Sequence, residues 1–324
     1  MLRMGNPGKM TETIPDGEVA RNIAEKHGYG SVSEVRRMVT GLCHYVYEVE
    51  RSNAPNVVVR IAGSKNRRMI ESAVYWSNML RPKGVPLPEI LYADHQDDHP
   101  FMILERLPGT DLGDVYSQLS SSERKDLAVH LQDIQERVCA LPKGQGYGYT
   151  ASYDGPFDHP DMISLCRASL NRTREWISNA DIFSPAIVDE VESVFEKRKD
   201  YLATIHPTPH LHDITTKNVL IHDNALSGIV DVDDLCFGDP IRTIALTQTA
   251  LLSRRQKTNY IDYWCDASGM TSEQRTALAM YTAESAACFL GEIGQAFNRE
   301  KAEPPDMSYA QVLLDIINEQ LALV

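Results

Sequence analysis

Hydrophobic residues in the first third of the chain alternate with polar ones, as they do in strands. Alternating runs cover 36–40, 44–50 and 57–62, and they are separated by turns at Gly41 and at 53–56. Period-two alternation between turn residues is typical of consecutive antiparallel strands joined by short hairpins. The pattern therefore predicts three adjacent antiparallel strands in this region.

Helical spacing appears on both sides of these strands. Asp16 can cap a first helix that Gly28 ends, and residues 65–80 place apolar side chains three and four positions apart. Two further strands are predicted at 87–93 and 100–104. We expect a small sheet of about five strands with one main helix over residues 30–106.

Beyond Pro108 and Gly109 the apolar spacing becomes helical almost to the end of the chain. The helices that it predicts cover 111–120, 122–140, 161–179, 184–203, 281–298 and 309–323. Two segments differ: 142–160 is rich in glycine, tyrosine and proline and is expected to be loop, and 205–240 has short apolar runs between Asp, Asn and Gly. A length of 324 residues suits two domains, which we place at 1–106, with residues 1–12 as a loose tail, and at 107–324.

The composition is that of a globular protein, with 43% hydrophobic and 24% charged residues. No apolar run is long enough for a membrane span or a signal peptide, so we expect a cytoplasmic protein without a membrane partner. The six cysteines are scattered and form no C-x-x-C pair, which argues against disulfides and against a structural zinc site. We interpret them as small apolar residues of the core.

The net charge of −13 argues against nucleic acid as a partner, because nonspecific binding to phosphates needs a basic surface. The charge is also uneven. Residues 1–106 hold 14 Lys and Arg against 13 Asp and Glu, a net charge of +1, whereas residues 107–324 hold 18 against 32, a net charge of −14. An acidic half is compatible with a cationic ligand, although acidic residues on a solvated surface that binds nothing would give the same charge.

Three polar residues have a spacing that suggests a catalytic site: Asp213, Asn218 five residues later, and Asp231 after the short apolar runs. Phosphoryl transfer needs a carboxylate that orients and deprotonates an attacking hydroxyl, and it needs oxygen ligands for Mg²⁺ on the nucleotide phosphates. A hairpin of 219–221 and 227–230 would bring these three residues to one cleft. Asp and Asn also simply mark turns, so the spacing alone is suggestive rather than decisive.

These residues resemble the signature of the aminoglycoside phosphotransferase and choline kinase family. Gly238-Asp239-Pro240, shortly after Asp231, matches the small-molecule branch of that family. The resemblance covers approximately residues 30–255. It implies an α+β, bilobal, protein-kinase-like fold, with a small antiparallel-sheet N-terminal lobe carrying one main helix and a larger, mostly helical C-terminal lobe. It further implies a catalytic loop at 210–218 and a metal loop at 231–240.

The resemblance also implies nucleotide-binding roles in the first lobe. Gly41 falls in the hairpin that covers the nucleotide, although an ordinary hairpin turn has the same sequence. Arg60 occupies the position of the basic residue that contacts phosphates, and Glu71 that of the acid that pairs with it; each could instead be a surface charge. The backbone from Glu105 to Leu107 matches the link between the lobes that hydrogen-bonds a purine.

The chain departs from the family at the residue two positions before Asp213. The family commonly has His there, and this chain has Leu211 between His210 and His212. His212 either replaces the structural role of the missing residue or is a buried histidine unrelated to catalysis.

The function implied is an ATP- or GTP-dependent, Mg²⁺-requiring O-phosphotransferase. Asp213 would be its catalytic base, and Asn218 and Asp231 its metal ligands. The acidic second half favours a cationic acceptor such as an aminoglycoside, and the acids that we expect to bind it are Asp234, Glu284 and Glu292. Choline-type alcohols, macrolides and sugars remain alternatives, as does a silent nucleotide-binding regulatory module. The protein is expected to be a monomer or a homodimer.

Overall fold

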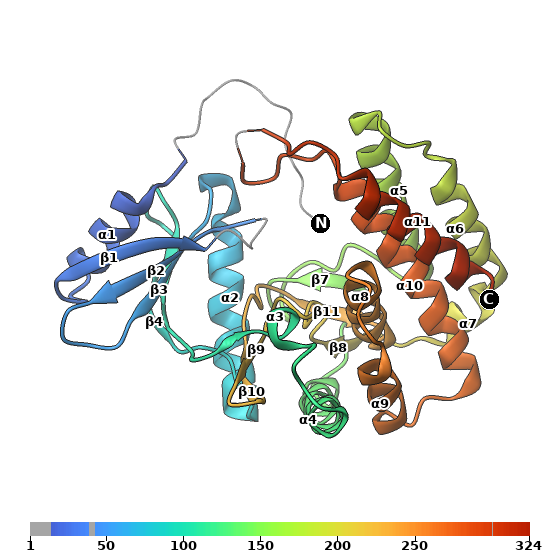
Figure 1. The fold of residues 1–324 in the computed structure, drawn as a ribbon, viewed down its shortest axis with the longest axis horizontal. Coiled ribbons are helices and arrows are strands. Elements are labelled where there is room, and N and C mark those ends of the chain that lie inside the picture. Colours follow the sequence, from blue (N-terminus) through green and yellow to red (C-terminus); the bar gives the residue numbers. More distant parts are fainter. Residues whose placement is uncertain (1–13, 39–42, 300) are drawn as a thin grey trace. The chain divides into compact units, whose positions relative to one another are not determined.

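The computed structural model describes residues 14–38, 43–299 and 301–324, and these form two compact units (Figure 1). The first unit contains the described residues up to Pro108, together with Thr150–Gly155 and Gly228–Asp234. The second contains Gly109–Tyr149, Pro156–Ser227 and Leu235–Val324. The segment with Asp231, which the sequence assigns to the helical half, thus belongs to the first unit by its contacts. The predicted tail at 1–12 lies outside the described residues.

The first unit is built on a five-stranded antiparallel sheet, as predicted. Its strand order is β1-β2-β3-β5-β4. The strands are β1 (Val32–Met38), β2 (Tyr45–Arg51), β3 (Val57–Ile61), β4 (Ile90–Asp94) and β5 (Phe101–Glu105). The helices of this unit are α1 (Gly17–Lys26) and α2 (Arg67–Leu80), with short 3₁₀ turns η1 (Ser64–Asn66) and η2 (Arg81–Lys83).

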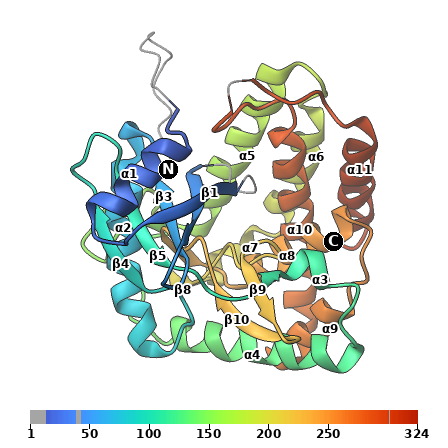
Figure 2. The same cartoon turned by 60° about the vertical axis from the view of Figure 1, so that its left-hand side comes forward.

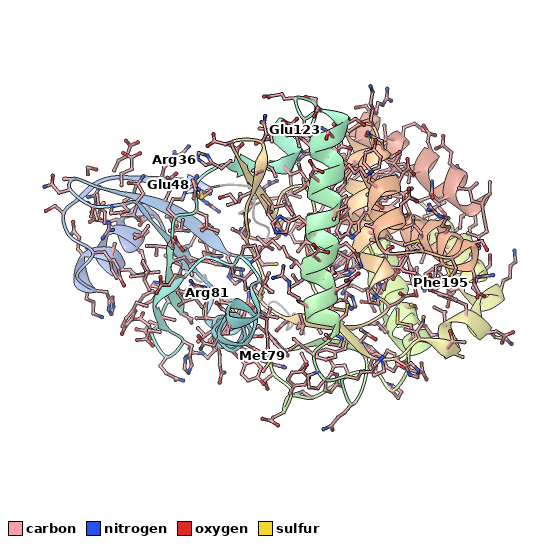
Figure 3. All side chains as sticks on the ribbon, turned by 90° about the horizontal axis from the view of Figure 1, so that it is seen from below. Arg36, Glu48, Met79, Arg81, Glu123 and Phe195 are labelled. Atoms are coloured by element: carbon pink, nitrogen blue, oxygen red, sulfur yellow. The ribbon has the colours of Figure 1, made fainter. Side chains whose placement is uncertain are left out.

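The two helices cover opposite faces of this sheet (Figure 2). Successive side chains of a strand point to opposite sides, so neighbouring residues of β3 belong to different cores. Val57, Val59 and Ile61 pack in one core with α1, whereas Val58 packs in the other core with α2. Arg60 lies two residues after Val58 on β3 and therefore points to the same face of the sheet, which is the face covered by α2. Across β1 and β2, Arg36 forms an ion pair with its register partner Glu48 (Figure 3).

The second unit is mostly helical, again as predicted. Its helices are α3 (Leu112–Val115), α4 (Ser121–Cys139), α5 (Met162–Ala180), α6 (Ala186–Lys197), α7 (Lys199–Thr204), α8 (Ile241–Ser253), α9 (Asn259–Ala267), α10 (Ser272–Glu292) and α11 (Met307–Leu321). The start of α4 is a capping box of Ser120 and Glu123, and Figure 3 labels Glu123 at that end of the helix. Among the described residues no helix is long and apolar enough to cross a membrane.

Some helix boundaries differ from the prediction. The helix expected at 111–120 is only the single turn of α3. The helix expected at 184–203 is divided at Arg198 into α6 and α7. The helix expected at 281–298 begins earlier, at Ser272, because Thr271 and Gln274 form a capping box there, and it ends at Glu292.

Short strands cover the segment 205–240, where the sequence showed short apolar runs. They are β8 (Thr208–His210), β9 (Val219–His222), β10 (Ala225–Ile229) and β11 (Leu235–Gly238), with β6 (Thr110–Asp111) and β7 (Gly148–Thr150) from earlier in the chain. They form two three-stranded sheets, β10-β9-β6 and β7-β11-β8. The predicted hairpin is present as β9 and β10, and its turn residues Asp223 and Asn224 have φ of 49° and 60°. Asp and Asn tolerate this left-handed conformation better than other side chains, which explains the turn.

Candidate active site

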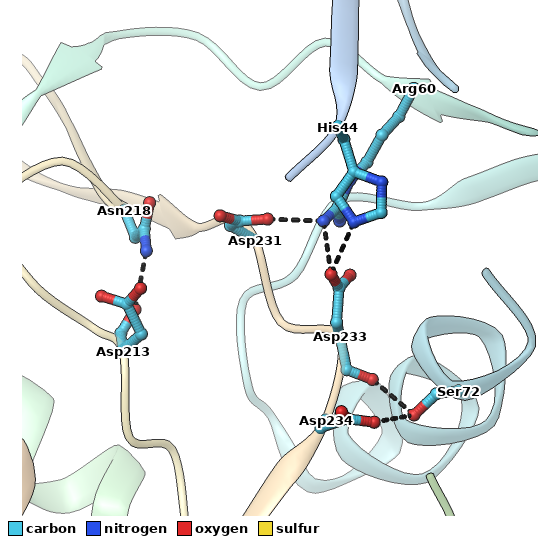
Figure 4. A network of polar contacts seen from close by, with 8 residues as sticks. All are labelled: His44, Arg60, Ser72, Asp213, Asn218, Asp231, Asp233 and Asp234. Carbon is cyan, nitrogen blue, oxygen red and sulfur yellow. Dashed lines mark hydrogen bonds and ion pairs between the residues drawn. The ribbon is translucent and has the colours of Figure 1, made fainter. Parts of the chain in front are cut away.

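Arg60 is a buried cation of the first unit. Its guanidinium lies 2.5 Å from Asp231 Oδ1 and 2.7 Å from Asp233 Oδ2 (Figure 4). The residue is only 5% exposed, so its charge needs these two carboxylates. We refer to Arg60, Asp231, Asp233 and His44 as the Arg60 cluster.

The ion pair expected between Arg60 and Glu71 is not formed among the described residues. Glu71 is exposed on α2, and Asp231 and Asp233 are the ion-pair partners of Arg60. The expectation is corrected on this point, because the segment after β10 carries two carboxylates directly to the buried side chain.

Asp233 is the centre of the Arg60 cluster, since His44 Nε2 also lies 2.8 Å from its Oδ2. Burial favours the neutral acid, but Arg60 and His44 lower the pKa of Asp233 to about 2. The carboxylate is therefore ionised at neutral pH. Ser72 Oγ on α2 lies 2.6 Å from the carbonyl oxygen of Asp233, so α2 packs directly against this backbone.

Asp231 differs from Asp233 in its accessibility. Its side chain is 40% exposed, whereas that of Asp233 is 13% exposed. Its φ of 63° is in the left-handed region, which is uncommon for a residue other than glycine and is often found at functional sites. Asp231 thus keeps an accessible carboxylate next to a buried arginine.

Asp234, one of the acids expected to bind the acceptor, is tied to the first unit. Its Oδ1 accepts a short hydrogen bond from Ser72 Oγ, and burial raises the pKa of its carboxyl group although Ser72 opposes the shift. This position favours an anchoring role for Asp234 rather than acceptor binding.

In the second unit, the loop between β8 and β9 holds Asp213 and Asn218 together. Asn218 is buried, and its Nδ2 donates to the backbone carbonyl of Asp213 at 2.9 Å (Figure 4). Thr215 Oγ1 donates to Asp213 Oδ1 at 3.0 Å. The amide hydrogen bond fixes which end of Asn218 is its oxygen, so that Oδ1 is available as an acceptor.

The backbone just before Asp213 is held by a residue that the sequence did not suggest. Gln135, on α4, accepts from Leu211 N at 3.0 Å and donates to Leu211 O at 2.8 Å. Thr243 Oγ1, on α8, donates to the same carbonyl at 2.8 Å. Leu211 itself is buried. Side chains from two helices therefore support this backbone, and His212 is not one of them.

Asp239 of the Gly-Asp-Pro segment is a structural anchor. It is buried, and it accepts hydrogen bonds from Tyr201 Oη at 2.7 Å and from Ile241 N at 3.1 Å. The second bond ties Asp239 to the first turn of α8. Because α8 also carries Thr243, this motif helps to position the loop between β8 and β9.

The two remaining acids expected to bind an acceptor have different surroundings. Glu284 is 2% exposed, and its Oε1 lies 3.0 Å from the buried Arg242. A carboxylate in this position neutralises Arg242, and we correct the expectation that it meets an acceptor. Glu292, at the end of α10, is partly buried, and burial raises its pKa to about 7, with Lys217 opposing the shift and Asp213 adding to it. Glu292 is therefore an acid in the electrostatic field of Asp213.

The expected nucleotide-link residues lie at the end of β5. Glu105 N donates to Glu89 O at 2.9 Å, and Leu107 O accepts a short hydrogen bond from Arg106. Leu107 also lies next to Gly228, where an added Cβ would be 2.4 Å from Leu107 Cδ1 and 2.9 Å from the backbone oxygen of Pro86, so a side chain there would force the backbone to shift. Gly41 lies outside the described residues.

Comparisons with solved structures show the same fold in aminoglycoside phosphotransferases. A thermostable mutant of aminoglycoside phosphotransferase APH(4)-Ia, in a ternary complex with ADP and hygromycin B, matches with a TM-score of 0.67 and 15% identity, covering 94% of this chain and 98% of that one. A GDP and kanamycin complex of APH(2")-IIIa matches with a TM-score of 0.69 and 15% identity, covering 95% and 99%. ADP-bound APH(2'')-Ib matches with a TM-score of 0.63 and 12% identity, covering 95% and 99%.

No curated protein sequence matches the chain significantly. The model of the phosphotransferase enzyme family does match, over residues 34–281, which is most of the chain and includes Arg60, Asp213, Asn218 and Asp231. The fold and the resemblance expected from the sequence are confirmed, and the chain belongs to the phosphotransferase enzyme family.

Proposed function

We propose that the protein transfers the γ-phosphoryl group of ATP or GTP to a hydroxyl group of a small cationic acceptor, with an aminoglycoside as the first choice. Membership of the phosphotransferase family supports the reaction class. The similar structures hold ADP or GDP, and two of them also hold hygromycin B or kanamycin. The acceptor class rests on these similarities and on the charge of −14 after residue 106.

Asp213 is the residue to which we assign the acceptor hydroxyl. The observation that carries this assignment is the closed loop in which Thr215 orients its carboxylate and Asn218 holds its backbone carbonyl. A carboxylate fixed in this way can accept the proton of the attacking hydroxyl as the new O–P bond forms. The nucleoside diphosphate leaves in the same step, so no covalent enzyme intermediate is needed.

The donor groups suit a magnesium ion. Asn218 offers an amide oxygen, since its nitrogen is already bonded to Asp213 O, and Asp231 offers a carboxylate that is 40% exposed. Hard oxygen ligands of this kind are those that Mg²⁺ prefers, and we propose that these two residues hold it. When bound, the ion neutralises charge on the nucleotide phosphates.

Arg60 is the residue that we assign to the phosphates, because a guanidinium can bind phosphate oxygens in a bidentate manner. In the structure its charge is shared between Asp231 and Asp233. Asp233 is the more buried partner and is also held by His44. We therefore propose that Asp233 keeps Arg60 in place when Asp231 engages the metal. Gly41 remains a predicted nucleotide contact, as does the backbone of Glu105 and Leu107.

Glu292 is the acid that we keep for the acceptor. It lies close enough to Asp213 and Lys217 for their charges to affect its pKa. An ammonium group of an amino sugar placed beside Asp213 would favour the ionised carboxylate of Glu292 and would be attracted by it.

A panel of acceptors tests the proposal. Release of nucleoside diphosphate is measured with ATP and with GTP in the presence of amino sugars, choline-type alcohols, macrolides and neutral sugars, and the product is identified by mass. The proposal predicts acceptor-dependent release with at least one cationic acceptor and a product that gains one phosphoryl group. Phosphorylation of neutral acceptors alone would refute the acceptor class, and tight nucleotide binding without transfer to any acceptor would favour a silent regulatory module.

A further inference from the structure

A second cluster of ligating side chains lies in the second unit, behind the catalytic loop. Cys236 on β11 is the register partner of His210 on β8. Paired residues of antiparallel strands have their side chains on the same face of the sheet. His212 lies two residues beyond the end of β8, and its ring centroid is 5.9 Å from that of His210. One ligand atom from each of these three residues lies within 4.8 Å of the other two.

His210 presents a nitrogen lone pair to this cluster rather than a proton. His210 Nδ1 lies 3.0 Å from the carbonyl oxygen of Thr208, which fixes the proton on Nδ1 and leaves Nε2 as the acceptor. His210 is 0% exposed, and its Nε2 has no hydrogen-bond partner among the described residues. The Nδ1 of His212 is also buried without such a partner there. Buried polar atoms are normally paired, so these two nitrogens point to a missing ligand.

The arrangement around the histidines is typical of metal ligands. An imidazole that binds a metal usually donates its other N–H to a carbonyl or a carboxylate, as His210 does to Thr208.

We propose that His210, His212 and Cys236 form a binding site for a thiophilic transition-metal ion, with Zn²⁺ as the best-fitting ion. Two imidazoles and a thiolate suit Zn²⁺ or Cu⁺ and do not suit Mg²⁺, which prefers oxygen ligands. Tetrahedral zinc with bonds of about 2.0–2.3 Å needs its ligand atoms about 3.3–3.8 Å apart. The three ligand atoms lie within 4.8 Å of one another, so side-chain movements of about 1 Å bring them to the distances that zinc needs. The cysteine loses its proton to solvent when it binds the ion.

Zinc binding at this site would contradict the expectation, drawn from the lack of a C-x-x-C pair, that the chain has no structural zinc site. It also has a structural consequence for the catalytic loop. His212 directly precedes Asp213, whereas His210 and Cys236 belong to the β8–β11 pair. An ion held by all three would fasten the backbone before Asp213 to these strands. It would thus add to the support that Gln135 and Thr243 give to Leu211.

The test uses the full-length protein without a histidine tag, prepared metal-free and then titrated with Zn²⁺. Bound metal is measured by elemental mass spectrometry after exhaustive dialysis, and Co²⁺ is used as a spectroscopic probe. We expect one Zn²⁺ per chain, a rise in Tm of a few degrees, and a thiolate-to-cobalt charge-transfer band. Cys236→Ser should lose the band and weaken Zn²⁺ binding by about 100-fold. Cys265→Ser, at another buried cysteine of the same unit, should behave as the wild type.

Two results would overturn the site. One is Zn²⁺ binding that is equally strong in Cys236→Ser, which would indicate adventitious surface binding. The other is a wild-type Co²⁺ spectrum without a thiolate band, which needs no variant and so does not depend on how Cys236→Ser folds. A parallel titration with Cu⁺ under anaerobic conditions distinguishes the two metals: Cys236-dependent binding of Cu⁺ without Zn²⁺ would keep the ligand set and replace the ion.

Discussion

Removing the charge of Asp233 should destabilise the protein more than its position in a loop suggests. Asp233 Oδ2 lies 2.7 Å from the guanidinium of Arg60 and 2.8 Å from His44 Nε2. Asp233→Asn keeps the size and some hydrogen bonding but removes one of the two charges that neutralise Arg60. The remaining partner is Asp231, whose side chain is 40% exposed and which is therefore the weaker counter-ion.

The pKa of Asp233 gives the magnitude. Its shift from 3.8 to about 2 means that the ionised form is bound more strongly in the folded state. At about 1.4 kcal/mol for each unit of pKa, this shift contributes about 2 kcal/mol of stability at neutral pH. Because the folded-state pKa is lowered, that contribution is present above pH 4 and is lost as the pH falls toward 2. We therefore expect Asp233→Asn to lower the free energy of unfolding by about 2 kcal/mol at pH 7.

The assay is urea unfolding followed by tryptophan fluorescence, to which Trp76, fully buried in the first unit, contributes together with Trp176 and Trp264 of the second. Asp98→Asn, at an exposed aspartate of the same unit, is the control and should change stability by less than about 0.5 kcal/mol. If Asp233→Asn is as stable as Asp98→Asn at pH 7, the Arg60 cluster does not need its second carboxylate. The role proposed for Asp233 would then be wrong.

Two further predictions concern the second unit. Gln135→Met leaves the buried Leu211 N–H without its acceptor, which should lower the free energy of unfolding in urea by about 1–3 kcal/mol and should lower kcat more than it raises the nucleotide KM. The control is Lys125→Met, at an exposed residue of the same helix. Equal effects of the two substitutions would show that the hydrogen bonds from Gln135 to Leu211 are dispensable. Burial raises the pKa of Glu292 in the folded state to about 7, so the wild type should lose stability as the pH rises from 4.5 to 7. Glu292→Gln has no carboxyl group to ionise and should therefore be more stable than the wild type above pH 7, by about 1–3 kcal/mol. Thermal unfolding across this pH range, with the exposed Glu319→Gln as control, measures the difference, and parallel pH profiles of wild type and Glu292→Gln would contradict it.

The elements that the sequence predicted well are those governed by local periodicity. Alternation in β3 placed Arg60 on a definite face of the sheet, and helical spacing in 65–80 anticipated α2. The turn at Asp223 and Asn224 was also visible, because these residues favour a left-handed backbone. In these cases the signal and the structure that it determines lie within a few residues of each other.

The contacts that the sequence did not predict join residues far apart in the chain. Asp233 meets Arg60 only because residues 228–234 pack with the first unit, and nothing local to either residue indicates this. Gln135 looks like any polar residue of an amphipathic helix until Leu211 is placed against it. Cys236 becomes a possible ligand only through the register of β11 with β8. Such pairings depend on tertiary packing, which periodicity does not encode.

The most direct test of the central proposal is the effect of Asp213→Asn on turnover and on nucleotide binding, measured on the same preparation with an active acceptor. If Asp213 takes the proton of the acceptor hydroxyl, turnover should fall by about 10²–10⁴-fold. The Kd for the nucleotide should meanwhile change by less than about threefold, since no nucleotide contact is assigned to that carboxylate. Turnover of Asp213→Asn within about tenfold of the wild type would contradict the assignment, whatever acceptor the protein uses.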